Sequence, residues 1–517
     1  MGNTAPPRAP PQAGELLHAA ETALVQHRAF GDSRYIRGQL AVTYRRRLRK
    51  LGAAMPAAQQ LAALLDADAQ DAGKSGSATR QQQFIGDIVL RCAIQHAMRQ
   101  VIKGDTYGLP LTECAALFDA ASAHWRAGLP GGPLTAGMPA ATRLHDSINT
   151  QVWQQEEGPL TRHALPPYPA AFLAVIEHNY GAPLATPTQD DMAMLRQGWN
   201  LLDSLLPRLA HSALEHVQLV ALYAPEGSWR GKASSSQFRV NGCIFLNRGL
   251  IGNPWWLAEH LLHEALHQKL YDFRHGHSLL GPGYEREDAP AVCSLWNAPD
   301  DMRSNYWDAH RTLAAFHVYV QLALLCLLAE QREDALAPRY GPISSRMSGS
   351  RRAIDRARYL GEQLHAVTWP ELGLAGRQMT DWLVDVLDVL DVQPRPAGAS
   401  LHLLLDLYQR QSRKLEVFLS KGAPSESPLI EQQAKAEAQA ALAALQAGGH
   451  AQALETLQAQ LQAGNAADWP HTRRIVLQAL NNMEDSAGNA ASEIGKEMIR
   501  EMVQQSSRQL AALGALG

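Results

Sequence analysis

The chain has 517 residues and a formal net charge of −3, with 46% hydrophobic and 19% charged residues. This composition is typical of a soluble globular protein, and the near-neutral charge argues against a nucleic-acid or other polyanionic partner. The five cysteines form no C-x-x-C pair, so we expect neither a disulfide framework nor a structural zinc site, and a reducing cytoplasm is the predicted compartment.

The first part of the chain is predicted to be a helical region behind a disordered tail. Residues 1–13 are rich in Pro and Ala, and no apolar core follows them, so no secretory signal is visible. Residues 14–180 form the N-terminal helical region, with a helical pattern to about residue 122. Between 125 and 169 Gly and Pro recur, which indicates a long loop or a domain boundary.

Residues 181–342 are predicted to form the catalytic core. The stretch 187–210 has the apolar spacing of an amphipathic helix, and 217–225, "VQLVALYAP", is typical of a strand. The stretch 235–249, "SSQFRVNGCIFLNRG", predicts a hairpin in which Asn241-Gly242 makes a tight turn. In that hairpin, the residues expected in extended structure are Phe238, Val240, Ile244 and Leu246.

A metal-binding motif follows the hairpin. "WLAEHLLHEALHQKL" carries His263, Glu264 and His267 in the order H-E-x-x-H. Leucines and alanines give the segment one apolar face, while Asn253 and Pro254 provide a typical helix start. Because residues four apart lie about 6 Å from each other on one helix face, the two imidazoles can bind one ion.

Two ligands do not complete a catalytic metal site, so we expect a third ligand elsewhere in the chain. His275 and His277, just after the motif, are expected on a loop and not at the metal. The apolar run 316–329 is too short to span a bilayer and predicts a buried helix. On that helix His310 and His317 share a face, and a buried imidazole needs a hydrogen bond or a metal, which makes His317 the preferred third ligand.

The order "GCIFLNRG", "LAEHLLHEALHQKL", "CSLWNAPDDMRS" and "AAFHVYV" resembles the HExxH motif-containing peptide-modification proteins. The resemblance spans about residues 186–329. It implies an iron(II)- and 2-oxoglutarate-dependent oxygenase that hydroxylates side chains of ribosomally made precursor peptides. Such a site leaves open positions on the iron for the cosubstrate and oxygen.

Carried onto this chain, the resemblance makes His263, His267 and His317 the iron ligands and assigns the distal carboxylate of 2-oxoglutarate to Arg303. Lys269 or Arg311 could take the place of Arg303. Glu264 would orient a ligand or water instead of acting as a general base. The chain departs from the family pattern where Asn297 replaces an arginine and Ser304 replaces a proline, which makes the assignment of Arg303 the weaker one.

Two other interpretations stay open. In a zinc metallopeptidase, His263 and His267 would bind zinc, Glu264 would activate water, and Glu287 or another acid would complete the site; Glu285 lies in the same Gly- and Pro-bounded loop. In a non-catalytic helical scaffold, the motif would be structural.

The last region, 343–517, is predicted to be helical, with a helical hairpin broken at Gly448-Gly449. The fold class expected for the whole chain is therefore mainly α with a small antiparallel β element (α+β). The expected partner is a peptide or protein substrate, with no membrane association, and the oligomeric state is not predicted.

Overall fold

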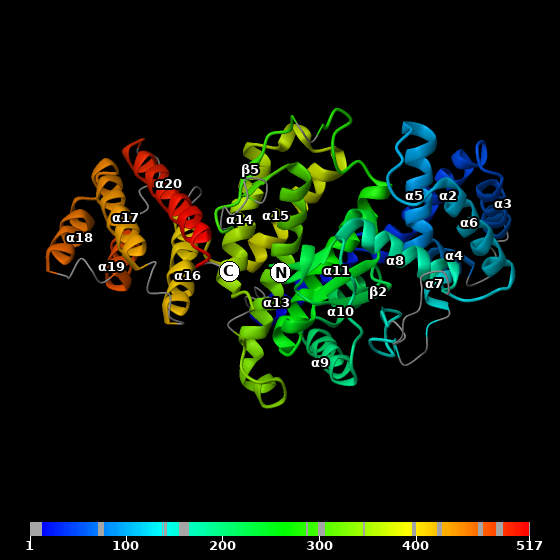
Figure 1. Ribbon diagram of the computed structural model, residues 1–517, viewed down its shortest axis with the longest axis horizontal. Coiled ribbons are helices and arrows are strands. Elements are labelled where there is room, and N and C mark those ends of the chain that lie inside the picture. Colours follow the sequence, from blue (N-terminus) through cyan, green and yellow to red (C-terminus); the bar gives the residue numbers. More distant parts are fainter. Residues whose placement is uncertain are drawn as a thin grey trace, which may run out of the picture. The chain divides into compact units, whose positions relative to one another are not determined.

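The computed structural model confirms a mainly helical protein with few strands (Figure 1). It describes residues 13–70, 77–136, 138, 142–154, 165–285, 288–297, 305–344, 347–394, 400–420, 427–463, 469–481 and 490–515. The tail predicted over 1–13 therefore lies outside the described residues except for its last position, where the first helix begins.

The chain forms two compact units. Unit 1 contains residues 1–279, 317–353 and 374–390, and unit 2 contains residues 280–316, 354–373 and 391–517. Each unit combines stretches that are separate in the sequence. The predicted division of the chain into the regions 1–13, 14–180, 181–342 and 343–517 therefore stays a prediction.

The N-terminal part of unit 1 is a set of packed helices. They are α1 (Ala13–Gln26), α2 (Ser33–Gly52), α3 (Pro56–Gln70), α4 (Ser77–Ile85), α5 (Ile88–Lys103), α6 (Leu111–Arg126), α7 (Pro133–Ala136) and α8 (Pro167–Tyr180). Side chains cap two of them, because Asp32 accepts from backbone N–H groups at the start of α2 and Asp87 does so for α5. Buried Leu, Ile, Phe and Ala side chains from α2 to α8 continue into one core with β2 and β4.

A four-stranded sheet lies beside these helices, in the order β1-β2-β4-β3. Its strands are β1 (Gln151–Val152), β2 (Leu219–Tyr223), β3 (Ser234–Ser236) and β4 (Cys243–Asn247). The strands β1, β2 and β4 are parallel, and β3 pairs antiparallel with β4. All residues of β2 and β4 are buried, as expected for central strands covered on both faces, whereas β3 is three half-buried serines at the edge.

The predicted strand over 217–225 is confirmed as β2, and the predicted hairpin is confirmed as the β3–β4 pair. Its details differ, because Phe238 and Val240 lie in a short 3-10 helix and not in a strand. Asn241-Gly242 does turn the chain, with Gly242 at φ 101°. The connection is longer than a two-residue turn, since Ser236 pairs with Ile244.

The helices α9 (Gln189–Leu205) and α10 (Pro207–Leu214) precede β2, and α11 (Pro254–Gly276) follows β4. The predicted motif helix is present as α11. The amphipathic helix predicted over 187–210 is present as α9 but ends at Leu205, because Pro207 begins a separate helix. Helix α11 packs against α2, α9, α10, β3 and β4. The approach of α9 is close at Gly198, where an added Cβ would stand 2.4 Å from the Leu257 side chain.

The helix α13 (Ala309–Tyr340) contains the apolar run 316–329. The run is buried as predicted, but the helix around it is longer than the run and has the length and hydropathy of a membrane span. Its most apolar window is 78% buried inside the protein, which is also the behaviour of a core helix.

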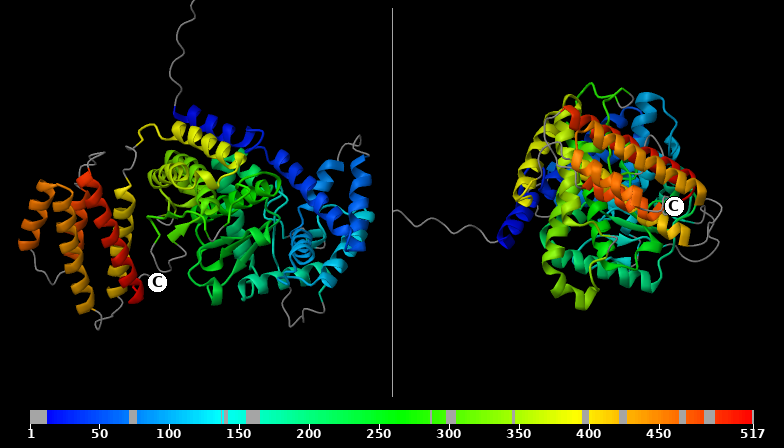
Figure 2. Two further views of the ribbon diagram at one scale, coloured as in Figure 1. Left: turned by 90° about the horizontal axis from the view of Figure 1, so that it is seen from above. Right: turned by 90° about the vertical axis from the view of Figure 1, so that its left-hand side faces the viewer.

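The remaining elements are the strands β5 (Val292–Cys293) and β6 (Tyr306–Trp307) and the helices α14 (Ser350–Ala366), α15 (Leu374–Leu390), α16 (Leu401–Ser420), α17 (Ser427–Ala447), α18 (Ala451–Ala463), α19 (Trp469–Asn481) and α20 (Ala490–Ala512). In unit 2, α17 packs against α18, α19 and α20 (Figure 2). The helical hairpin predicted around Gly448-Gly449 is confirmed, with Gly449 at φ 76° after the end of α17.

Candidate metal centre

The two histidines of the motif meet on one face of α11. Asn253 caps the helix by accepting from the Trp256 N–H at 3.0 Å, and Pro254 occupies the first turn, where no backbone donor is needed. Further along the same helix, the Nε2 atoms of His263 and His267 lie 3.2 Å apart, and both rings are half-buried. The motif helix therefore brings both predicted ligands together.

The separation fits two ligands of one ion. Two nitrogens at about 2.1 Å from a metal lie about 3.4 Å apart in a tetrahedral site and about 3.0 Å apart when they are adjacent in an octahedral one. The observed 3.2 Å lies between these values. The same distance suits an N–H···N hydrogen bond, so the metal-free pair can share a proton between the rings.

Glu264 is buried beside this pair and faces the sheet edge. Its Oε1 accepts a hydrogen bond from the Ser234 hydroxyl of β3 at 2.5 Å. Burial raises the pKa of Tyr180 and of Tyr223, and the Glu264 carboxylate adds to both shifts, which places these phenols near it. Glu264 thus links α11 to β3, with the aromatic side chains of Tyr180 and Tyr223 nearby.

Sequence reasoning missed His260, which lies one turn before His263. Its Nδ1–H donates to the Trp256 carbonyl at 2.9 Å, and its ring stacks on the Trp256 ring with centroids 4.0 Å apart. Burial lowers the pKa of His260 to about 4, so the ring is neutral at pH 7 and its Nε2 carries a lone pair. The signal was present in the sequence, because His260, His263 and His267 share one face by steps of three and four residues.

His317 lies inside α13 in a different environment. Its Nε2 is 3.0 Å from the Gln321 amide nitrogen, and burial lowers its pKa to about 3, with a further contribution from the charge of Lys269. Within the part of the chain that the structure describes, no three His, Cys, Asp or Glu side chains are grouped as metal ligands. The structure thus joins His263 to His267 but not to His317, whose role as third ligand stays a prediction.

Lys269 lies on the far side of α11. It follows His267 by two positions and so points about 160° away around the helix axis. Its Nζ donates to the Gly31 carbonyl at 2.6 Å and to the Ser212 hydroxyl at 2.8 Å. Burial lowers the pKa of Lys269 to about 7. These contacts tie α11 to α10 and to the turn before α2, and its predicted contact with 2-oxoglutarate remains untested.

The other predicted site residues are either outside the described part of the chain or exposed, apart from His310. Arg303 and Glu287 lie outside the described residues. Arg311 is exposed on α13, with its guanidinium 4.9 Å from the centre of the Trp307 ring, and Glu285 is exposed. His310 is half-buried in the first turn of α13.

One expectation about the end of the motif helix was wrong. His275 belongs to the last turn of α11 and not to a loop, because the helix continues to Gly276. Its ring nitrogens lie 3.3 Å from the Tyr44 hydroxyl and 3.2 Å from Arg47 Nη2. His277 is the C-terminal cap of the same helix and stacks on Phe273.

A buried charge network holds α11 from the side opposite the histidine pair. Asp272 accepts hydrogen bonds from Arg91 Nη1 at 2.7 Å and from the Asn241 amide at 2.9 Å. Its other carboxylate oxygen lies 2.7 Å from His216 Nδ1. Although burial opposes it, Arg91 and His216 keep the pKa of Asp272 below its usual value. The network fixes the rotation of α11 relative to α5 and the start of β4.

No family model matches the chain, and no curated protein matches it.

Proposed function

We propose that the chain is an Fe(II)- and 2-oxoglutarate-dependent oxygenase that hydroxylates side chains of a peptide lying beside β3. The observation that carries a metal-dependent function is the 3.2 Å approach of His263 Nε2 to His267 Nε2 on α11. The resemblance of the surrounding residues to peptide-modification proteins supports the choice of iron and oxygen over other metal chemistry.

The sheet edge supports a peptide substrate. The strand β3 pairs with β4 on one side and is the last strand of the sheet among the described residues. An edge strand presents backbone donors and acceptors that can pair with an extended chain. Ser234 of this strand contacts Glu264, next to His263. A peptide added along β3 would therefore run past the histidine pair.

Each residue of the site has a defined task in this proposal. His263 and His267 hold the ion through their Nε2 atoms. The hydrogen bond from Ser234 to Glu264 fixes the position of α11 relative to β3. Buried aromatic rings around the site, including Trp256 and Trp229, limit the access of water. When bound, Fe(II) with 2-oxoglutarate supplies the oxidising power: one oxygen atom of O2 enters the substrate C–H bond, the other enters succinate, and CO2 leaves.

A second candidate is a zinc peptidase, which the position of Glu264 favours. Its buried carboxylate lies directly after His263 and faces the strand that would hold the peptide. A carboxylate beside a zinc ion can take the proton of a zinc-bound water. Both candidates need a third ligand, for which His317 and Glu287 are the respective predictions.

Anaerobic reconstitution with Fe(II) and 2-oxoglutarate separates the two candidates. The oxygenase predicts a long-wavelength charge-transfer band on mixing and succinate formation after oxygen is admitted, both lost in His263→Ala and His267→Ala. The control is His18→Ala, at an exposed position on α1. Retained zinc, no band and cleavage of a peptide would instead establish the peptidase.

A further inference from the structure

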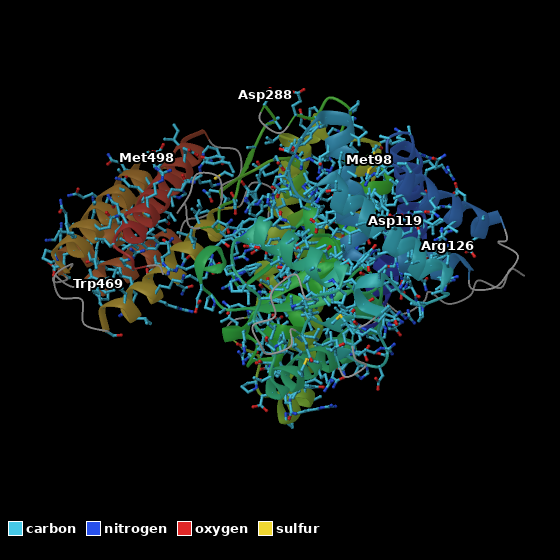
Figure 3. All side chains as sticks on the ribbon, turned by 45° about the vertical axis from the view of Figure 1, so that its right-hand side comes forward. Met98, Asp119, Arg126, Asp288, Trp469 and Met498 are labelled. Carbon is cyan, nitrogen blue, oxygen red and sulfur yellow. The ribbon has the colours of Figure 1, made fainter. Side chains whose placement is uncertain are left out.

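Unit 1 contains a cavity of about 290 Å³ that is separate from the histidine pair. Its walls come from α5, the α5–α6 loop, α6 and α8, which pack against one another. Figure 3 labels Met98 on α5 and Asp119 on α6, in the same group of helices. Leu109 and Val175 contribute apolar surface, and the polar side chains are His96, His178, Glu113 and Glu177.

The fold prepares His96 as a hydrogen-bond donor. The Leu109 N–H donates to His96 Nδ1 at 3.1 Å, so in the neutral ring the proton sits on Nε2. His96 is only 3% exposed, and burial lowers its pKa to about 4, which keeps it neutral at pH 7. Among the described residues no hydrogen-bond partner is found for Nε2, although the ring lines the cavity.

A glycine makes this arrangement possible. Gly108 has φ 89°, and a Cβ at this position would stand 2.5 Å from His96 Nδ1. Only glycine therefore lets the loop lie against the imidazole and direct the Leu109 N–H at it.

The charge of the cavity selects for a cation. Glu113 of α6 is half-buried and Glu177 of α8 is exposed, and none of the described residues that line the cavity is Lys or Arg. The guanidinium groups of Arg99 and Arg239 lie over the Tyr107 ring at 5.1 and 4.6 Å from its centre, and after burial their charges help to lower the pKa of His96. Leu109 and Val175 add apolar surface beside the glutamates, which suits the methylene groups of an organic cation.

We propose that this cavity binds a small molecule whose aliphatic chain carries an ammonium group at one end and a hydrogen-bond acceptor at the other, as lysine does. The ammonium group lies at the carboxylates of Glu113 and Glu177, the acceptor takes the proton of His96 Nε2, and the methylene groups lie on Leu109 and Val175. The amine can come from a free amino acid or from a lysine residue of a peptide.

Calorimetric titration of the full chain with matched small molecules tests this. We expect L-lysine to bind at least about tenfold more tightly than L-norleucine, which has a methyl group in place of the aminomethyl group, because charge-assisted hydrogen bonds are the stronger ones. Cadaverine, which lacks the acceptor, binds more weakly than lysine. Nα-acetyl-lysine amide binds as well as lysine if the source is a peptide, and more weakly if it is a free amino acid.

Variants locate the binding. Glu113→Gln and Glu177→Gln each weaken lysine binding by about tenfold, and Ala174→Phe, which fills the cavity, removes it. The control Glu226→Gln changes an exposed glutamate outside the lining and leaves binding unchanged. Equal binding of lysine and norleucine, equal weakening by Glu226→Gln and Glu113→Gln, or no saturable binding of any amine would overturn the proposal. Because Glu177 is exposed, its variant keeps the test valid even if Ala174→Phe disturbs folding.

Discussion

His263 and His267 turn their Nε2 atoms toward each other because four residues make one helical turn plus about 40°. This part of the site could be predicted from the sequence, since it depends on one helix alone. The partners of Lys269 could not, because Gly31 and Ser212 reach its Nζ only through the folded chain, whereas Gln321 lies one turn after His317 on the same helix. The sequence around Lys269 does not show which distant backbone carbonyl will accept a hydrogen bond from its ammonium group.

The Ser234 hydroxyl is predicted to stabilise the buried Glu264 carboxylate. Ser234→Ala removes that donor and should lower the free energy of unfolding by about 1.5–3 kcal/mol, as for hydrogen bonds to charged groups. Ser236→Ala is the matched control in the same strand, because the Ser236 hydroxyl is buried without a hydrogen-bond partner, so its removal should change the stability by less than about 0.5 kcal/mol. Thermal unfolding of both variants measures the difference, and equal losses would contradict the role given to Ser234.

Lys269 should make stability depend on pH above neutrality. Burial lowers its folded-state pKa to about 7 from the ordinary lysine value of 10.5, so between these pH values the unfolded chain binds the extra proton. The contribution of this group to stability therefore rises as pH increases from about 7 to 10.5, by up to about 1.4 kcal/mol per pH unit.

Lys269→Met removes this dependence. Compared with the variant, the unsubstituted chain should gain melting temperature between pH 7 and pH 9, and Lys103→Met, at an exposed position, should follow the unsubstituted chain. Parallel melting curves for Lys269→Met and the unsubstituted chain at every pH would show that Lys269 keeps its ordinary pKa.

Whole elements were predicted well where one local signal decides them. Asn253 and Pro254 mark the start of α11, and the apolar run at 219–223 forms β2. Phe238 and Val240 were misplaced, because alternating apolar residues also suit the 3-10 turn that leads into β4. The order of strands, with β4 between β2 and β3, depends on contacts between segments far apart in the chain and leaves no local pattern.

The packing of α9 on α11 should depend on Gly198. A methyl group there would stand 2.4 Å from the Leu257 Cβ, so Gly198→Ala should destabilise the protein by about 1–3 kcal/mol through overpacking. Gly38 in α2 is the matched helical glycine, since its added Cβ would meet only the Gln82 amide nitrogen at 3.6 Å. Gly38→Ala should therefore stabilise by about 0.4–1 kcal/mol. Denaturant titration compares the two, and opposite signs are required.

At the scale of the whole molecule, each compact unit is held by its own buried ion pair. In unit 1 Arg91 contacts Asp272 at 2.7 Å, and both side chains are at most 3% exposed. In unit 2 Arg473 contacts Glu437 at 3.1 Å, with both at most 2% exposed. The sequence identified the helices that carry these residues but not the pairs, because the partners in each pair are separated by at least 36 positions.

Glu437 connects four helices of unit 2. It lies on α17 and accepts from the Tyr408 hydroxyl of α16 at 2.6 Å, from Arg473 Nη1 of α19, and from the Ser506 hydroxyl of α20 at 2.5 Å. Glu437→Gln leaves a buried guanidinium without its counter-charge and should lower the stability of unit 2 by about 3–5 kcal/mol. The histidine pair lies in unit 1, so metal affinity measured by chelator competition should not change.

Asp272→Asn should lower both the stability of unit 1 and the metal affinity. It removes the counter-charge of Arg91 on the same helix as His263 and His267, so it should destabilise unit 1 by a similar amount, about 3–5 kcal/mol, and also weaken metal binding. In scanning calorimetry we expect each variant to lower the transition temperature of a different unit, because the two ion pairs belong to separate cores. If Glu437→Gln reduced metal affinity as strongly as Asp272→Asn, the two units would have to unfold and bind as a single cooperative body.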